Sequence, residues 1–223
     1  MYFTADKREI ELSIGEILDS MGYQGTVPDD YILEQIRKFR QEALDLLEAR
    51  YVYKQVEGFV ASDALNIQDE MKFGIGRIIA RCLRDSECFC FFIATAGVEI
   101  QNWINKYREK GEILDFYIAD SVGSALIEKV ADYMQAKIKE EMSLSDLRIS
   151  NRYSPGYCGW NIAEQQILFQ LMGNNTCGVT LSPSSLMYPV KSVSGVIGAG
   201  KNIRYMEYGC GICNQANCFR RKK

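Results

Sequence analysis

The sequence predicts an α+β fold in one compact domain, on three observations. Apolar residues recur every three or four positions through much of the first two thirds of the chain, which is typical of amphipathic helices. A continuous apolar run at 88–95 (CFCFFIAT) has the length and aromatic content of a buried strand. Near the C-terminus, valine-rich stretches alternate with glycine and proline, as in a β-hairpin.

The elements follow from this periodicity and from its breaks at glycine and proline. We expect a strand to begin at Tyr51, a buried strand over 88–95, and a hairpin that pairs 186–197 with 203–208. Cys88 and Cys90 share one side of the buried strand, where a thiol acts as a small apolar side chain. Helices are expected over residues 10–21, 28–50, 75–83, 98–110, 113–142 and 161–172.

Composition excludes several classes of protein. The chain has 223 residues, of which 47% are hydrophobic and 25% charged, as in ordinary globular domains. A net charge of −3 gives no broad basic field, so we expect no nucleic-acid partner. No run of about 18 apolar residues occurs, and the charged first residues do not resemble a signal peptide. We therefore expect a cytoplasmic protein without a membrane span.

The chain contains no histidine, which removes a large class of mechanisms. Catalytic triads with histidine, zinc hydrolases with histidine ligands, and acid–base catalysis by imidazole are all excluded. Any chemistry must come from a cofactor, a thiol, a carboxylate or the positioning of reactants.

The segment Arg152-Tyr-Ser-Pro-Gly-Tyr157 is the first candidate site. A Pro-Gly turn brings backbone amides close to a guanidinium and an aromatic ring. Arginine can bind a carboxylate with two hydrogen bonds, and a tyrosine face attracts a cation. The loop suits a zwitterion that carries a flat base, although such a hexamer is also a common arginine-anchored turn.

Over most of residues 90–209 the chain resembles the activation domain of cobalamin-dependent methionine synthase. The N-terminal third is instead similar to shorter stand-alone relatives, with an E-x-L-x-x-x-G-Y helix at 16–23. The matching segments are ATAG at Ala94–Gly97, the helix through Ala119, Asp120 and Ala131, the RxxPGY motif at 152–157, and LSPSSLMYPVKSVSG at 181–195, with Ser184, Met187, Pro189 and Ser192–Gly195 in the family's order.

The resemblance implies a single C-shaped domain, with a twisted antiparallel sheet flanked by helices, that binds S-adenosylmethionine in a shallow groove. It implies a methyltransferase-type activation component that reductively methylates cobalamin on a corrinoid-binding partner, such as a split methionine synthase. An electron donor such as flavodoxin or ferredoxin would reduce Co(II). Residues 1–60 would form an N-terminal helical segment of the same domain, 61–209 the ligand-binding core, and 210–223 a cysteine-rich basic tail.

Site residues follow from the same resemblance. Arg152 would bind the methionyl carboxylate, the backbone at Ser154 and Gly156 the adenosine, and Tyr157 would lie near the sulfonium and the corrin. Tyr205 and Met206 stand where the family has two tyrosines, so Met206 is a departure. Glu16 is the candidate for the methionyl amine. After Tyr157 the family usually has Pro-Ala-Cys-Pro-Asp, whereas this chain has Cys158-Gly159-Trp160-Asn161.

A second candidate site is the array Cys210-x2-Cys213-x4-Cys218. Three thiolates at this spacing can bind zinc or an iron–sulfur cluster, with Cys158 or Cys177 as the fourth ligand. A redox pair of thiols and unligated thiols remain alternatives. A cluster here could pass the electron that reduces Co(II).

Two other functions remain open. In a non-enzymatic interaction module, the cysteine array would bind a structural metal and the Arg152 loop would be a turn. A conventional S-adenosylmethionine-dependent methyltransferase is the other, although the glycine-rich loop after an early strand that such enzymes carry is not visible.

Overall fold

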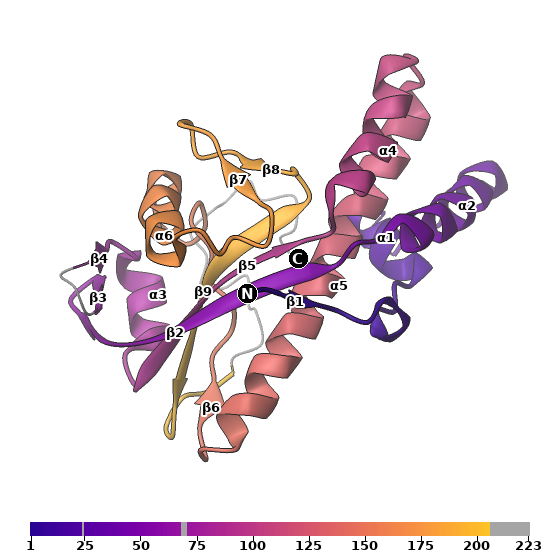
Figure 1. Ribbon diagram of the computed structural model, residues 1–223. Helices are drawn as coiled ribbons and strands as arrows, with labels where there is room; N and C mark the ends of the chain where they lie inside the picture. The colour runs from indigo at the N-terminus through magenta and orange to yellow at the C-terminus, as the bar shows by residue number, and fades with distance from the viewer. Residues whose placement is uncertain (24, 68–70, 206–223) are drawn as a thin grey trace.

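The computed structural model describes residues 1–23, 25–67 and 71–205, and shows one main sheet between two groups of helices (Figure 1). A seven-stranded sheet has the order β4-β3-β2-β5-β9-β6, with β1 paired to β2. Every pairing in it is antiparallel. The strands are β1 (Phe3–Thr4), β2 (Arg50–Ala61), β3 (Ala64–Ile67), β4 (Lys72–Phe73), β5 (Cys88–Thr95), β6 (Arg148–Ile149) and β9 (Ser192–Gly200).

Two further strands, β7 (Thr180–Leu181) and β8 (Met187–Tyr188), form a small separate sheet. None of the helices in the described ranges is both long and apolar enough to cross a membrane. The helices are α1 (Ile14–Ser20), α2 (Asp30–Leu46), α3 (Gly76–Leu83), α4 (Val98–Glu109), α5 (Ile113–Ser143) and α6 (Gln165–Met172), with short 3-10 turns at Lys7–Glu9 and Ile162–Glu164.

The central strand β5 is buried on both sides and separates two hydrophobic cores. Because successive side chains of a strand point to opposite faces, its residues divide between the cores. Cys88, Cys90 and Phe92 pack with α1, α2, α4 and α5 on one side, which we call the α5 face. Phe89 and Phe91 pack with α3, α6 and the loop at 153–160 on the other, the α6 face.

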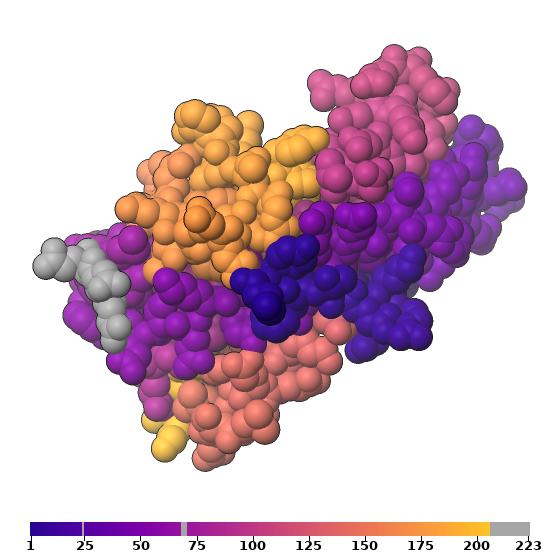
Figure 2. Space-filling view, in the orientation of Figure 1, coloured from indigo at the N-terminus to yellow at the C-terminus, as the bar shows by residue number. Residues whose placement is uncertain are grey.

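The arrangement of these layers is visible in the figures. The long helix α5 runs beside the sheet, and α2 and α4 extend beyond it (Figure 1). The indigo N-terminal residues lie on the surface against orange residues of the later chain (Figure 2), where the Asn175 side chain donates to the Met1 carbonyl at 2.8 Å. The α+β fold with a mostly antiparallel sheet and flanking helices is confirmed.

Two expectations differ from the structure. The first helix begins only at Ile14, because Ser13 caps it and Glu16 bonds back to the Ser13 backbone in a capping box. The hairpin prediction is wrong over 203–205, which lie outside any strand. The strand β9 pairs instead with β5 and with β6, far earlier in the chain.

Candidate functional site

The loop that contains Arg152 is fixed to the edge of the sheet. After β6, Tyr153 exchanges two backbone hydrogen bonds with Val196 of β9, at 3.0 and 2.8 Å. A Cβ atom at Gly195 would lie 2.1 Å from the Tyr153 carbonyl, so only glycine permits this approach. Since Tyr153 is buried in the α6 face, the adjacent Arg152 is directed to the α5 side.

The turn after Arg152 is closed by its own backbone and anchored by a tryptophan. Gly156 has φ +94° and donates to the Trp160 carbonyl at 2.8 Å, and the Trp160 amide donates to the Tyr157 carbonyl at 2.9 Å. Trp160 is 1% exposed, whereas Tyr157 is 59% exposed. The loop therefore presents the Tyr157 ring on a rigid support.

Three acceptors on one side of α5 bind the Arg152 guanidinium. It donates to Asp132 and Gln135 at 2.9 Å each and to Glu128 at 3.3 Å. Glu128, Asp132 and Gln135 are spaced four and three residues apart, so they share one face of the helix. The Arg152 side chain is only 19% exposed, which strengthens these charge-assisted bonds.

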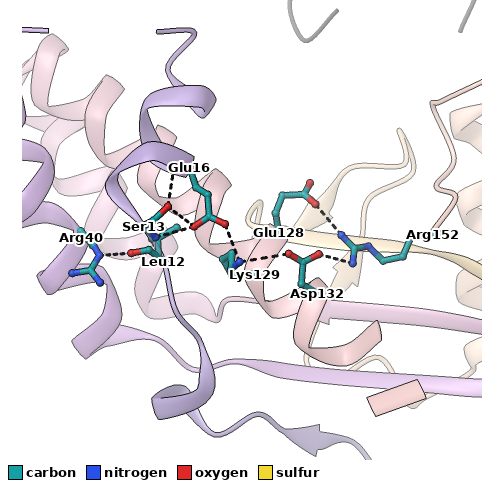
Figure 3. Close-up of polar contacts among 8 residues, drawn as sticks. All are labelled: Leu12, Ser13, Glu16, Arg40, Glu128, Lys129, Asp132 and Arg152. Atoms are coloured by element: carbon teal, nitrogen blue, oxygen red, sulfur yellow. Dashed lines mark hydrogen bonds and ion pairs between the residues drawn. The ribbon is translucent and has the colours of Figure 1, made fainter. Parts of the chain in front are cut away.

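A chain of polar contacts joins Arg152 to Glu16 (Figure 3). Lys129 lies between them, 2.9 Å from Glu16 and 3.8 Å from Asp132. Burial would raise the pKa of Glu16, but the hydrogen bonds from Lys129 and Ser13 outweigh it and lower that pKa. The bond to Glu16 in turn raises the pKa of Lys129. Glu16 and Arg152 thus belong to one network without touching.

A groove of about 880 Å³ begins at this network. Asp132 and Gln135, which bind Arg152, line one part of it, and Tyr205 lines it as well. Tyr205 is 61% exposed. Two residues that bind Arg152 therefore line the same groove as Tyr205, and Glu16 lies at the far end of the polar network.

Sequence reasoning missed Glu128, Asp132 and Gln135. Their spacing on a helix was the available signal, but charged residues at such spacing usually form a solvated helix surface. Met206, Cys210, Cys213 and Cys218 lie outside the described residues. Within the described ranges, no group of three histidine, cysteine, aspartate or glutamate side chains could hold a metal ion.

The two candidates for a fourth metal ligand differ in environment. Cys177 is 1% exposed, and its sulfur donates to the Ile93 carbonyl at 3.7 Å. Burial raises the pKa of Cys177 to about 12, which opposes the thiolate that a metal requires. Cys158 is half-buried and directly follows Tyr157, with φ +52°.

The chain segment after the turn carries very few charges. Between Tyr153 and Gly200 the only charged side chains are Glu164 and Lys191. Glu164 accepts from the Trp160 indole at 2.9 Å, and Lys191 lies 2.7 Å from Asp120. Large apolar side chains are exposed nearby, at Tyr157, Ile162, Leu186, Tyr188 and Val190.

Comparison with known proteins adds three findings. No curated protein sequence matches the chain. The fold is similar to a crystal structure of the MetH reactivation domain bound to AdoHcy, with a TM-score of 0.66 and 16% identity, over 94% of this chain and 81% of that one. The family model described as the activation domain of vitamin B12-dependent methionine synthase matches residues 68–223. Because that match spans more than half of the sequence, the chain belongs to the family of vitamin B12-dependent methionine synthase activation domains.

Proposed function

We propose that this chain binds S-adenosylmethionine beside α5 and supplies its methyl group to a corrinoid cofactor on a partner protein. The observation that carries the proposal is the Arg152 guanidinium, which is held by two α5 residues, Asp132 and Gln135, that line the same groove as Tyr205. Family membership and the fold shared with a reactivation domain crystallised with AdoHcy support it.

The charges around Arg152 suit a zwitterion with a sulfonium. Glu16, Glu128 and Asp132 face Lys129 and Arg152, so three carboxylates stand against two cations. The ligand's carboxylate can bind the Arg152 guanidinium in place of a side-chain carboxylate. That side-chain carboxylate can then bind the ligand's ammonium group. The remaining negative charge suits S-adenosylmethionine, which carries one net positive charge. Glu128 and Asp132 are nearer to Arg152 than Glu16 is, so the role of Glu16 toward the amine stays a prediction.

The sparsely charged segment that follows the Arg152 turn is the proposed docking surface for the corrin. A corrin ring carries methyl groups and amide side chains at its rim, and needs apolar contacts and neutral hydrogen-bonding groups. Tyr157, Leu186 and Tyr188 supply exposed apolar rings and chains. Tyr157 belongs to the same turn as Arg152, and this closeness in the chain is our reason to propose that the docked cofactor meets the methyl donor at that turn.

The reaction needs little from acid–base groups, which fits a chain without histidine. One electron from a donor protein reduces Co(II) to Co(I), the methyl group moves from sulfur to cobalt, and S-adenosylhomocysteine leaves. Cob(I)alamin is already a strong nucleophile, so the protein contributes proximity and orientation. We further propose that the thiols at 210–218 bind zinc or an iron–sulfur cluster, and anaerobic reconstitution with iron and sulfide tests the cluster.

Calorimetry with S-adenosylmethionine tests the proposal. Arg152→Ala is expected to weaken binding about thirtyfold, the equivalent of about 2 kcal/mol for charge-assisted bonds. Arg108→Ala, on the exposed side of α4, is the matched control and leaves affinity unchanged. Absence of binding by the wild type, or unchanged affinity in Arg152→Ala, overturns the proposal and favours an interaction module.

A second assay separates the rival enzyme. Methyl transfer to free cob(I)alamin is followed by the visible spectrum of the cobalt product. Transfer to a small molecule or protein in the absence of any corrinoid would instead indicate a conventional methyltransferase.

A further inference from the structure

The part of the groove away from Arg152 is basic. Lys139 of α5, Arg148 of β6 and Arg204 after β9 line it, and all three side chains are exposed. They come from three separate elements, so their convergence depends on the tertiary fold. S-adenosylmethionine, itself a cation, does not account for them.

Within the described residues, no carboxylate pairs with any of these three cations. The acidic residues of the same stretch of α5 have other partners. Asp132 binds Arg152, Glu140 pairs with Lys137 at 3.5 Å, and Glu141 accepts from Tyr53. Like charges that share a groove repel one another, and an anion removes that cost.

The walls between these cations are apolar. Ile149 and Ile203 are almost fully buried and Leu147 is half-buried, while the Tyr205 ring remains exposed. Apolar walls suit the base or sugar of a nucleotide, and basic side chains that line the same groove suit phosphate oxygens. Ligand sites commonly combine such walls with a few polar groups.

We propose that this end of the groove binds the phosphate of a nucleotide among Lys139, Arg148 and Arg204, with the base or sugar against the apolar wall at Ile203. This goes beyond the proposed methyl transfer and does not depend on it. The phosphate could belong to a free nucleotide or to the nucleotide tail of a corrinoid, which carries a phosphodiester.

Titration with AMP, adenosine and cyanocobalamin tests the site. We expect AMP to bind at least about tenfold more tightly than adenosine, and Arg148→Gln and Arg204→Gln each to weaken AMP about tenfold. Lys137→Gln removes one charge from the same helix outside the groove lining and is the matched control, with AMP affinity within twofold of the wild type. Rising salt should weaken AMP binding, because the side chains are exposed.

The outcomes distinguish a free nucleotide from the nucleotide tail of a corrinoid, and failure of this site from failure of the S-adenosylmethionine site. Binding of AMP alone assigns the site to free nucleotides, and binding of cyanocobalamin that the same two variants weaken assigns it to the corrinoid tail. Equal affinity for AMP and adenosine, or no effect of Arg148→Gln and Arg204→Gln on either ligand, overturns the proposal. Arg148→Gln should leave S-adenosylmethionine affinity within twofold, so failure at one site is distinguishable from failure at the other.

Discussion

The two tryptophans lie on opposite faces of the sheet. Each is buried and donates its indole N–H to a glutamate, but the surroundings differ. Trp103 packs among the helices of the α5 face, and its indole donates to Glu42 at 2.9 Å. Trp160 packs in a loop on the α6 face, and its indole donates to Glu164 at 2.9 Å. The helices that cover the α5 face have regular apolar spacing, whereas the core of the α6 face includes an irregular loop beside the short helices α3 and α6.

The comparison predicts equal losses when either ring is removed. Trp103→Ala and Trp160→Ala should each lower the free energy of unfolding by roughly 3–5 kcal/mol, because each empties a buried site and removes one hydrogen bond to a carboxylate. Both cores share β5, so unfolding should remain a single cooperative transition. Urea denaturation followed by far-UV circular dichroism and by fluorescence of the remaining tryptophan measures both effects.

Trp→Phe at each site is the control, since it keeps an aromatic ring and loses the N–H. A loss below about 1 kcal/mol in Trp160→Ala, alongside a loss of roughly 3–5 kcal/mol in Trp103→Ala, would show that the core around Trp160 contributes little to the stability of the fold. The Tyr157 turn would then lack the rigid support argued above.

The α5 face was the easier of the two to predict. The continuous run at 88–95 predicted β5 with its observed bounds, and helical spacing predicted α4 and α5 to within one residue at their ends. The short strands β3, β4, β6 and β7 were missed, because two to four residues carry no periodicity. Pairing of β9 with β5 also escaped, since partners about a hundred residues apart leave no local signal.

The same reasoning explains the limits at the site. Arg152 and Tyr205 could be selected because motifs mark them. Glu128 and Asp132 could not, because their relation to Arg152 depends on how α5 lies beside the loop after β6. The ion pair between Glu16 and Lys129 could not be predicted from the sequence either, because the two residues are 113 positions apart in the chain.

The two faces also differ in the roles of their carboxylates. We therefore expect Glu164→Ala to affect mainly stability and Asp132→Asn to affect mainly ligand affinity. Glu164 binds the Gly74 amide and the Trp160 indole, so Glu164→Ala should cost about 1–3 kcal/mol of stability by stranding those donors. Its effect on S-adenosylmethionine affinity should be below twofold. Thermal denaturation and calorimetry on the same preparation measure the two quantities.

Asp132→Asn should show the reverse pattern. We expect S-adenosylmethionine to bind about tenfold more weakly, a loss of about 1.4 kcal/mol, because the local negative charge that favours a cationic ligand disappears. Stability should change by less than about 0.5 kcal/mol, since Asp132 is exposed. Tighter binding in Asp132→Asn would show that this carboxylate competes with the ligand for Arg152 more than it attracts the ligand's positive charge.

The smallest expected effect lies at the far end of the polar network. Glu16→Gln removes the ion pair with Lys129 but keeps a side chain that can cap α1, so about 0.5–1 kcal/mol of stability should be lost at pH 7.

Because the folded pKa of Glu16 is lowered, its contribution is present above the unfolded pKa and is lost as pH falls through the folded value. The raised pKa of Lys129 gives the opposite limit, with its contribution complete below about pH 10 and lost at higher pH. Urea denaturation of wild type and Glu16→Gln between pH 3 and 11 should therefore give stability curves whose difference is largest near neutral pH and shrinks toward both ends of the range. Ser13→Ala, which removes a neutral cap, should remain about 1 kcal/mol less stable throughout. A Glu16→Gln difference that persists unchanged at pH 3 would contradict the ion pair and assign the effect to the cap alone.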